Sequence, residues 1–503
     1  MRKSLLAASA VLSLAITLAT ASPASARHRL APVPGSPGIG DSYYPDYGNG
    51  GYDVAHYDIR LRYRPDSDLL TGTTTILARA TQDLSRFNLD FVLDTATVRV
   101  NNRAATFARE GDHELVVTPA RPILAGQLMT IVVQYSGVPS TKVAAGFTAW
   151  TRTTDGALAV GQPQIAWWWY PSNDHPKDKA TFDISVSVPN GVEVLSNGVM
   201  PRPPLPELIG WTRWSWRMTT PAATYLAFLA IGQFEITTDT AANGQQIINA
   251  YAEGLGEIEG AARGSVERTA EVVEFLEGFF GPYPVDAQGG VVVRLGQLGF
   301  ALETQTRSVY DGGFWRRGSN MYVVVHENAH QWVGDSVAID DWKHIWLNEG
   351  FATYAEWLWS EAVGEGTAQE VFDFTYAFYP EDGGFWQVLP GDPGPENQFD
   401  IAVYDRGAMT LHQLRLLIGD EAFFGLVRTW LALHRNGDVN TDEFIALAEQ
   451  VSGQELSAFF DTWLFTPARP AVGGEAAAAR TAAVVAEPKS WAKIQLGREL
   501  RIG

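Results

Sequence analysis

The chain has 503 residues, and its 37 Lys and Arg against 57 Asp and Glu give a formal net charge of −20. An acidic surface repels phosphates, which argues against nucleic acid as a partner, and the 46% hydrophobic content is that of a folded globular protein. The sequence has no cysteine, so disulfides and thiolate chemistry are excluded and any metal must be held by histidines and carboxylates.

Residues 1–26 have the organisation of a secretory signal peptide. Two basic residues near the start precede an apolar stretch over residues 5–18, and residues 24–26 supply a small-residue cleavage pattern. A membrane anchor is the alternative, but the stretch is shorter than the roughly 20 residues that cross a bilayer. We therefore expect cleavage after this segment and a secreted, extracellular product that is not attached to a membrane.

Two segments with different patterns follow. Residues 27–51 are rich in Pro, Gly and Ser, and we expect a flexible leading segment there. Between residues 52 and 240, apolar and polar side chains alternate in short runs separated by turn signals, as at Tyr57, Ile59 and Leu61. This period is typical of half-buried strands, so the sequence predicts a β-rich N-terminal domain over residues 52–240.

Helical periodicity dominates after residue 241. Apart from a short strand over residues 290–294, apolar positions recur at helical spacing, which predicts a second, mixed domain over residues 241–470 and an α+β fold class. Residues 471–503 begin with an Ala/Gly-rich run and are expected to be a disordered or loosely docked tail. The predicted helices cover residues 267–280, 321–333, 346–361, 406–418, 420–433 and 441–451.

The most informative pattern is His326-Glu327-Asn328-Ala329-His330, which lies inside one of the predicted helices. On a helix, positions i and i+4 lie one turn apart on one face. Both imidazoles can therefore bind one metal ion while Glu327 lies beside a bound water. Accidental spacing on a surface helix is the alternative, but a chain with only 9 histidines should rarely produce this pattern by chance.

A catalytic zinc site needs a third protein ligand, because such sites use three side chains and keep one position open. Glu349 lies on the next predicted helix and can supply it. We therefore predict one Zn²⁺ per chain, held by His326, His330 and Glu349, with Glu327 as the general base. Glu356 lies two turns further along the helix of Glu349 and is expected to orient a ligand imidazole, the alternative being a plain surface charge.

These motifs resemble those of the M1 family of zinc aminopeptidases, and the likeness extends over roughly residues 50–470. Residues 348–352 have the sequence Asn-Glu-Gly-Phe-Ala, which is the family's signature around the third ligand. Residues 300–304 are similar to the family's Gly-Ala-Met-Glu-Asn motif and keep its glutamate as Glu303. Two further segments resemble family stretches: Tyr-Asp-Arg-Gly at residues 404–407 and Gln-Pro-Gln at residues 162–164.

The resemblance implies a thermolysin-like α/β zinc-peptidase domain after the β-rich domain, and it assigns roles to three more residues. Tyr404 would stabilise the carbonyl oxygen that becomes negative during attack. Glu303 would pair with the free α-ammonium of a peptide, and Gln164 would add a neutral acceptor for the same amine. Residues 300–303 would form an edge strand that pairs with the substrate backbone.

Two positions depart from the family motif, because Phe300 and Thr304 stand where the family has Gly and Asn. We expect these changes to alter the preference for the first substrate side chain rather than to abolish activity. The remaining histidines lack ligand spacing and are assigned structural roles: His28, His56, His113, His175, His344, His412 and His434.

Three hypotheses for the function follow. The leading one is a secreted, monomeric zinc aminopeptidase that removes residues from the N-termini of peptides or proteins. A thermolysin-like zinc endopeptidase is the second, and it would cleave N-acetylated peptides that an amine-anchored enzyme leaves intact. A catalytically silent peptide-binding protein on the same fold is the third; loss of the base or of a ligand would indicate it, and Glu327, His326, His330 and Glu349 are all present.

Overall fold

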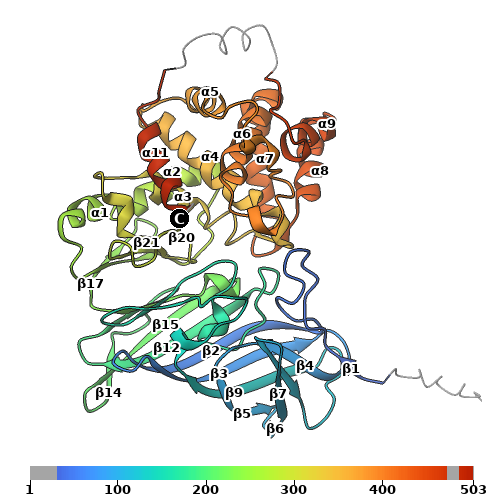
Figure 1. Cartoon of the computed structure of the whole chain (residues 1–503), viewed down its shortest axis with the longest axis vertical. Helices are drawn as coiled ribbons and strands as arrows, with labels where there is room; N and C mark the ends of the chain where they lie inside the picture. The colour runs from blue at the N-terminus through green and yellow to red at the C-terminus, as the bar shows by residue number, and fades with distance from the viewer. Residues whose placement is uncertain (1–30, 473–485, 502–503) are drawn as a thin grey trace, which may run out of the picture. The chain divides into compact units, whose positions relative to one another are not determined.

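The structure is a computed structural model that describes residues 31–472 and 486–501 (Figure 1). The predicted signal peptide over residues 1–26 lies outside the described residues. In Figure 1 the blue and green first half of the chain is mainly strands and the yellow to red second half is mainly helices. The predicted α+β class is therefore confirmed. None of the described helices combines the length and the apolar character needed to cross a membrane.

The largest sheet lies in the β-rich region and has eight strands. The strand at residues 52–64 shows the predicted alternation. It buries Tyr57, Ile59, Leu61 and Tyr63, and the residues between them are more exposed. In spatial order the strands are β14 (Leu205–Leu208), β15 (Trp211–Ala222), β12 (Ala180–Pro189), β2 (Tyr52–Arg64), β3 (Leu69–Ala80), β9 (Leu128–Gly137), β5 (Asp94–Val100) and β6 (Arg103–Ala104).

Two four-stranded sheets complete this region, and large aromatic side chains such as Trp150, Trp168 and Trp169 are fully buried in it. The first sheet contains, in spatial order, β1 (Val33–Pro34), β4 (Leu84–Asp90), β8 (Glu114–Thr118) and β7 (Thr106–Glu110). The second contains β10 (Trp150–Arg152), β11 (Ala157–Ala159), β16 (Leu229–Gly232) and β13 (Glu193–Leu195).

The second region is built on a five-stranded sheet, whose strands in spatial order are β17 (Phe234–Thr240), β18 (Gln246–Ala252), β19 (Ala287–Val293), β21 (Ser308–Asp311) and β20 (Ala301–Leu302). The predicted boundary after residue 240 is wrong, because β17 pairs with β18 and so belongs to this sheet. β20 is an edge strand, as expected for residues 300–303. A two-stranded sheet joins β22 (Ala338–Ile339) to β23 (Asp438–Val439).

All six predicted helices are present, two of them with clearly different bounds, and the structure adds helices at residues 259–266, 368–378 and 457–460 that were not predicted. The helix that carries His326 ends at Ala329, earlier than expected, because the carbonyl of His330 accepts the amide of Asp335 in the following loop. The helix that carries Tyr404 begins earlier than expected, because the side chain of Asp400 caps it. The described helices include α1 (Glu259–Val266), α2 (Thr269–Phe280), α3 (Tyr322–Ala329), α4 (Trp346–Ala362), α5 (Ala368–Phe378), α6 (Ile401–Ile418), α7 (Asp420–Leu433), α8 (Thr441–Ser452), α9 (Ser457–Phe460) and α11 (Trp491–Arg501).

The leading segment, predicted over residues 27–51, is docked over its described part rather than free, so that prediction is wrong. Asp41 is buried, and its Oδ2 lies 3.0 Å from Nε2 of His175 and accepts the amide of Trp342 at 2.8 Å. Ser42 donates to Asp341 through both its amide and its hydroxyl. These polar contacts join the segment to the β-rich region and to the helical region, which the Pro/Gly/Ser composition does not reveal.

The predicted tail also differs from the structure. Residues 473–485 lie outside the described residues, but residues 491–501 form α11, whose Trp491, Ile494 and Leu496 are buried. Arg498 of this helix forms a buried ion pair with Asp405 of α6. The expectation of disorder is therefore wrong for the end of the tail, because this helix has an apolar face and a buried charge partner in the second region.

Candidate active site

Two helices bring the predicted metal ligands together. α3 carries His326 and is followed at once by His330, and α4 packs against it with Glu349 in its first turn. The Nε2 atoms of both imidazoles lie 3.3 Å from Oε2 of Glu349. All three side chains are buried, and the structure brings their ligand atoms within 4.8 Å of one another.

The outer nitrogen of each imidazole also has an acceptor. Nδ1 of His326 lies 2.7 Å from Oε1 of Glu356, and Nδ1 of His330 lies 3.0 Å from the carbonyl oxygen of Val333. Each acceptor can hold the ring proton on Nδ1, which makes the lone pair of Nε2 available to a metal ion. Glu356 therefore lies where an orienting acceptor is needed.

The donor set fits Zn²⁺. Two neutral imidazole nitrogens and one carboxylate are the ligands that catalytic zinc sites use, together with one open position. Burial raises the pKa of Glu349, but the charge of a protonated His330 ring and hydrogen bonds from both rings hold that pKa well below its usual range. Glu349 is therefore an anion, and the three residues can hold a divalent cation with about one net positive charge left at the site.

Two further glutamates lie beside the three ligands. Carboxylate oxygens of Glu327 and Glu303 and a ring nitrogen of His330 lie within 4.8 Å of one another, and both glutamates are buried. Burial raises the pKa of Glu303 to about 7; His330 opposes this shift, and the charges of Glu349 and Glu327 add to it. The site thus places several carboxylates around one point, where a cation would be stabilised.

Glu303, directly after β20, is held by groups from both regions. Its Oε1 accepts hydrogen bonds from the hydroxyl of Tyr225 at 3.1 Å and from Nε2 of Gln162 at 3.3 Å. Its backbone carbonyl accepts a hydrogen bond of 3.0 Å from Nε2 of Gln331, just after α3. Sequence reasoning missed Tyr225, because no motif marks it and only the packing of the β-rich region brings it to this carboxylate.

Gln164, predicted to bind the substrate amine, does not lie beside Glu303. Its buried side chain lines another hollow together with Tyr44 and His113, whereas Gln162 contacts Glu303 and lines the cleft. The structure therefore places Gln162, and not Gln164, beside Glu303. The segment is an irregular loop rather than a strand, so residues two positions apart need not point to the same side.

A cleft of about 340 Å³ opens beside these residues. Gln162 and Tyr404 both line it, and the ring centroid of Tyr404 lies 6.1 Å from that of His326. Tyr404 is therefore next to the metal ligands and in the wall of the cleft at once. The apolar part of the wall is formed by Leu298, Phe300, Ala301, Leu302, Phe399 and Leu500.

The two positions that depart from the family motif have different surroundings. Phe300 lines the cleft, where it can contact a substrate side chain. Thr304 is buried, and its hydroxyl donates to the carbonyl oxygen of Arg307 at 2.7 Å, which closes the turn after β20. Thr304 therefore supports the edge strand, and of the two positions it is Phe300 that faces the cleft.

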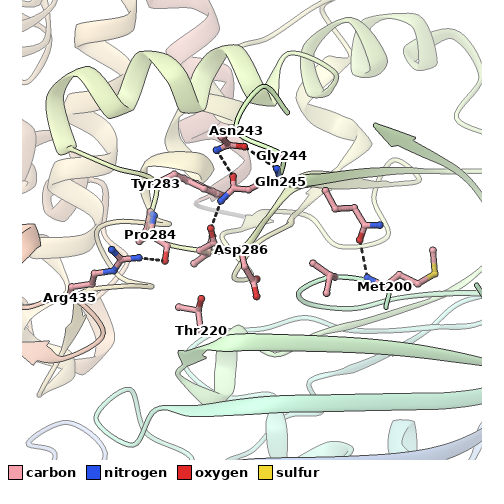
Figure 2. Close-up of a pocket in the computed structure, with 12 residues that line it drawn as sticks. Met200, Thr220, Asn243, Gly244, Gln245, Tyr283, Pro284, Asp286 and Arg435 are labelled. Carbon is pink, nitrogen blue, oxygen red and sulfur yellow. Dashed lines mark hydrogen bonds between the residues drawn. The ribbon is translucent and has the colours of Figure 1, made fainter. Parts of the chain in front are cut away.

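A larger hollow, of about 620 Å³, lies at the turn between β17 and β18 (Figure 2). Figure 2 shows its polar side chains bound to nearby backbone: Nε2 of Gln245 donates to the carbonyl of Val285 at 2.6 Å, and Arg435 donates to that of Pro284 at 2.9 Å. None of the predicted site residues lines this hollow. Size alone therefore does not make it the functional site.

The fold and the site together define a class: peptidases in which a His-Glu-x-x-His helix packs against a second helix that bears the third zinc ligand. Two family models match the chain. The model described as the Peptidase M1 N-terminal domain matches residues 54–226, and the one described as the Peptidase family M1 domain matches residues 314–463. The chain belongs to the M1 family of peptidases.

Known relatives agree with this assignment. The chain is 24% identical over 461 residues to aminopeptidase M1 of Arabidopsis thaliana, covering 83% of this chain and 51% of that protein. It is 29% identical over 345 residues to aminopeptidase N of Lactococcus lactis, covering 61% of this chain and 38% of that protein. The chain thus spans about half or less of the length of these curated relatives.

A solved structure matches over nearly its full length. It is a mutant M1 zinc metallopeptidase from Deinococcus radiodurans bound to a Tyr-Ser-Ala substrate, with a TM-score of 0.76 and 29% sequence identity. The match covers 86% of this chain and 99% of that one. The β-rich region followed by a helical peptidase region is therefore an arrangement that a solved M1 metallopeptidase shares.

Proposed function

We propose that the protein is a zinc aminopeptidase that removes residues one at a time from the N-termini of peptides. The observation that carries this proposal is the position of Glu303, whose carboxylate lies within 4.8 Å of Glu327 and of a ring nitrogen of the ligand His330. An anion at this place can pair with a free α-ammonium, and pairing there puts the first peptide bond of the substrate at the metal.

His326, His330 and Glu349 would hold the zinc ion, which supplies Lewis acidity to the scissile carbonyl and to the attacking water. Glu327 takes the proton from that water and passes it to the amine that leaves. Glu327 is suited to both steps because it is buried beside the ligands and follows His326 directly on α3. Proton transfer and metal binding are thus assigned to neighbouring side chains of one helix.

Tyr404 is assigned the second donor to the carbonyl oxygen. Its ring lies 6.1 Å from that of His326 and in the wall of the cleft. A hydroxyl that donates as negative charge develops on the carbonyl oxygen lowers the barrier, because it binds the transition state more strongly than the substrate. Phe300 and its apolar neighbours in the same wall would contact the first substrate side chain.

Cleavage of matched free and N-acetylated peptides, read by mass spectrometry, tests the proposal. We expect sequential removal of residues from the free peptide and no cleavage of the acetylated one. Glu303→Gln should raise KM for free peptides by about 10-fold or more, because a charge-assisted contact worth roughly 1.5–3 kcal/mol is lost. The matched control is Glu274→Gln, which alters an exposed glutamate of α2 and should leave KM unchanged.

Two outcomes would overturn this function. Internal cleavage of the acetylated peptide at a comparable rate would show an endopeptidase instead. A protein that contains zinc yet cleaves none of a panel of aminoacyl substrates would be a peptide-binding protein on the same fold.

We also propose that the protein is secreted and acts as a monomer. The signal-like organisation of residues 1–26 supports the first part. N-terminal sequencing of protein recovered from the medium should find a chain that begins near residue 27, and light scattering should give the mass of one chain. Retention of residues 1–26 on a membrane fraction, or a dimer mass, would contradict these two parts respectively.

A further inference from the structure

A second cluster of metal-binding side chains lies in the β-rich region, outside the proposed active site. Asp90 ends β4, Glu114 begins β8, and the two residues pair directly across the antiparallel ladder. Residues paired in this way place their side chains on the same face of the sheet. His113 precedes Glu114, and one ligand atom from each of the three side chains lies within 4.8 Å of the others.

The distances within this cluster are close to those that an ion would bridge. Nε2 of His113 lies 3.5 Å from Oδ1 of Asp90 and 3.9 Å from Oε1 of Glu114. The carbonyl oxygen of Asp46 lies 3.0 Å from the same nitrogen. Three side chains and one backbone oxygen therefore present four possible ligands on one side of the sheet.

The carboxylates of the cluster are buried, and Oδ1 of Asp90 has no hydrogen-bond donor. Asp90 is fully buried, whereas Glu114 is 7% exposed, and the side chain of Asn88 is the one donor near the Glu114 carboxylate among the described residues. Over the described parts of the chain, His113 is the one ion-pair partner of the two carboxylates, and no Lys or Arg pairs with either. A buried carboxylate oxygen without a donor is costly, and coordination of a metal removes that cost.

The other carboxylate oxygen of Asp90 does have hydrogen-bond donors. Its Oδ2 accepts hydrogen bonds from Nδ2 of Asn49 at 3.0 Å and from the amide of Asp174 at 2.8 Å. One side of the carboxylate is thus fixed by the surrounding chain, and the side that faces His113 and Glu114 is left open.

His113 is held in a defined orientation. Its ring stacks on that of Trp167 with a centroid distance of 4.0 Å, and the edge of Tyr47 packs against it. Nε2 donates to the carbonyl oxygen of Asp46. Nδ1 lies 3.3 Å from Oδ1 of Asp112, an acceptor that can hold the ring proton when a metal ion takes the place of the Nε2 proton. Asp46 and His113 also line a hollow of about 380 Å³.

We propose that Asp90, His113 and Glu114, with the carbonyl oxygen of Asp46, form a second binding site for a divalent metal ion of the zinc or manganese kind. Two carboxylates balance the charge of a divalent ion, and an imidazole favours such ions over calcium, which takes six to eight oxygens. The site joins β4 to the start of β8 and to the leading segment, so the bound ion has a structural role.

The test measures metal binding at this second site in a protein whose active-site ligands have been removed. In full-length protein carrying His326→Ala and His330→Ala, stripped of metal by chelation, titration with Zn²⁺ or Mn²⁺ and metal analysis should give one bound equivalent per chain. Adding Glu114→Gln or, separately, His113→Gln should abolish that equivalent. Both replacements nearly conserve volume, and circular dichroism checks that each variant is folded.

The matched control is Glu110→Gln, which alters an exposed carboxylate of β7 near the cluster and should leave the equivalent in place. Unsubstituted protein should bind two equivalents. A folded His326→Ala/His330→Ala protein that binds no metal would overturn the proposal, and so would binding that survives Glu114→Gln and His113→Gln. Because peptidase activity is not the readout, this result is independent of the proposed function.

Discussion

The active-site cluster and the β-region cluster use the same donor types but differ in their surroundings. In the first, the outer nitrogen of His326 is bound by Glu356 and that of His330 by a carbonyl, and Glu349 contacts both rings. In the second, Oδ1 of the buried Asp90 accepts no hydrogen bond and faces His113 and Glu114. The first cluster is thus organised by the protein alone, whereas the second is complete only with an ion.

This difference suggests different roles for the two ions. A site whose ligands are already oriented can leave a position open and bind a reactant there without rearrangement. The active-site cluster is also bordered by Glu327, Glu303 and the cleft that contains Tyr404. The β-region cluster lies instead against the rings of Tyr47 and Trp167, which suits an ion that ties the chain together.

The largest expected effect is that of Glu327→Gln. It should lower kcat by about 10²- to 10⁴-fold, because the general base is lost while the zinc ligands remain. Kinetics on an aminoacyl substrate together with metal analysis would show low turnover at full zinc content. Glu274→Gln on α2 is again the control. If the Glu327→Gln protein kept most of its activity, Glu327 would not be the general base, and the active-site cluster would not differ from the β-region cluster in this way.

The next effect concerns the buried pair that joins α11 to α6. Arg498→Met should lower the free energy of unfolding by about 3 kcal/mol, because it leaves Asp405 buried without its cationic partner. The substitution should also lower kcat, because Asp405 directly follows Tyr404 on α6 and a shift of Asp405 would move Tyr404. Denaturant unfolding measures the first effect. Glu499→Gln, which breaks exposed ion pairs of the same helix, should cost less than about 1 kcal/mol, and equal losses would contradict the docking of α11.

A third prediction sharpens the comparison of how the two clusters are supported. Glu356→Gln should weaken zinc binding at the active site by about 10- to 100-fold, because it removes the charged acceptor that orients His326. Competition with a coloured chelator gives the dissociation constant, with Glu361→Gln on the same helix as control. Asp112→Asn, beside His113, is the counterpart in the other cluster. If Asp112→Asn weakened metal binding at the β-region cluster by the same factor, His113 would depend on Asp112 as strongly as His326 depends on Glu356.

The smallest expected effect is a pH-dependent loss of stability. It concerns the ion pair between Asp155 of the β-rich region and Arg294 of the second region. Burial alone would raise the pKa of Asp155, but hydrogen bonds from Arg294, the amide of Gln233 and the hydroxyl of Thr153 lower it to about 2. A lowered folded-state pKa stabilises the protein above the unfolded-state value near 3.8, and this stability is lost as pH falls toward 2.

Asp155→Asn should therefore cost about 1 kcal/mol near pH 7, after allowance for solvent screening of a partly exposed pair. The difference in unfolding free energy between the two proteins should shrink below about pH 4, as the unfolded-state carboxyl becomes protonated. Unfolding of both proteins in urea at several pH values measures this free-energy difference. A difference that stays constant from pH 7 to pH 3 would show that the charge of Asp155 is not responsible.

Local patterns predicted much of the fold and part of the site. The i, i+4 spacing of His326 and His330 needs only one helical turn to bring the rings together, so it was visible in the sequence. Segment ends were less predictable, because apolar periodicity continues after Ala329 while the backbone of His330 bonds forward to Asp335. The docking of α11 was missed because the ion pair between Arg498 and Asp405 spans distant parts of the chain.

The site residues divide in the same way. Gln162 and Tyr225 reach Glu303 from the β-rich region, and neither could be placed by spacing along the chain. His113 was assigned a structural role, since its partner Asp90 lies on a different strand and only strand register sets them opposite each other.

The sequence by itself determined the absence of cysteine chemistry and the two-part α+β organisation, and it pointed to His326, His330 and Glu349 as one cluster, because composition and short helical spacings are local properties. Only the tertiary structure decided which glutamine meets Glu303, where the chain's last helix docks, and that Asp90 and Glu114 share a face. Those contacts depend on loop direction, strand register and long-range packing, and none of these has a period that can be read along the chain.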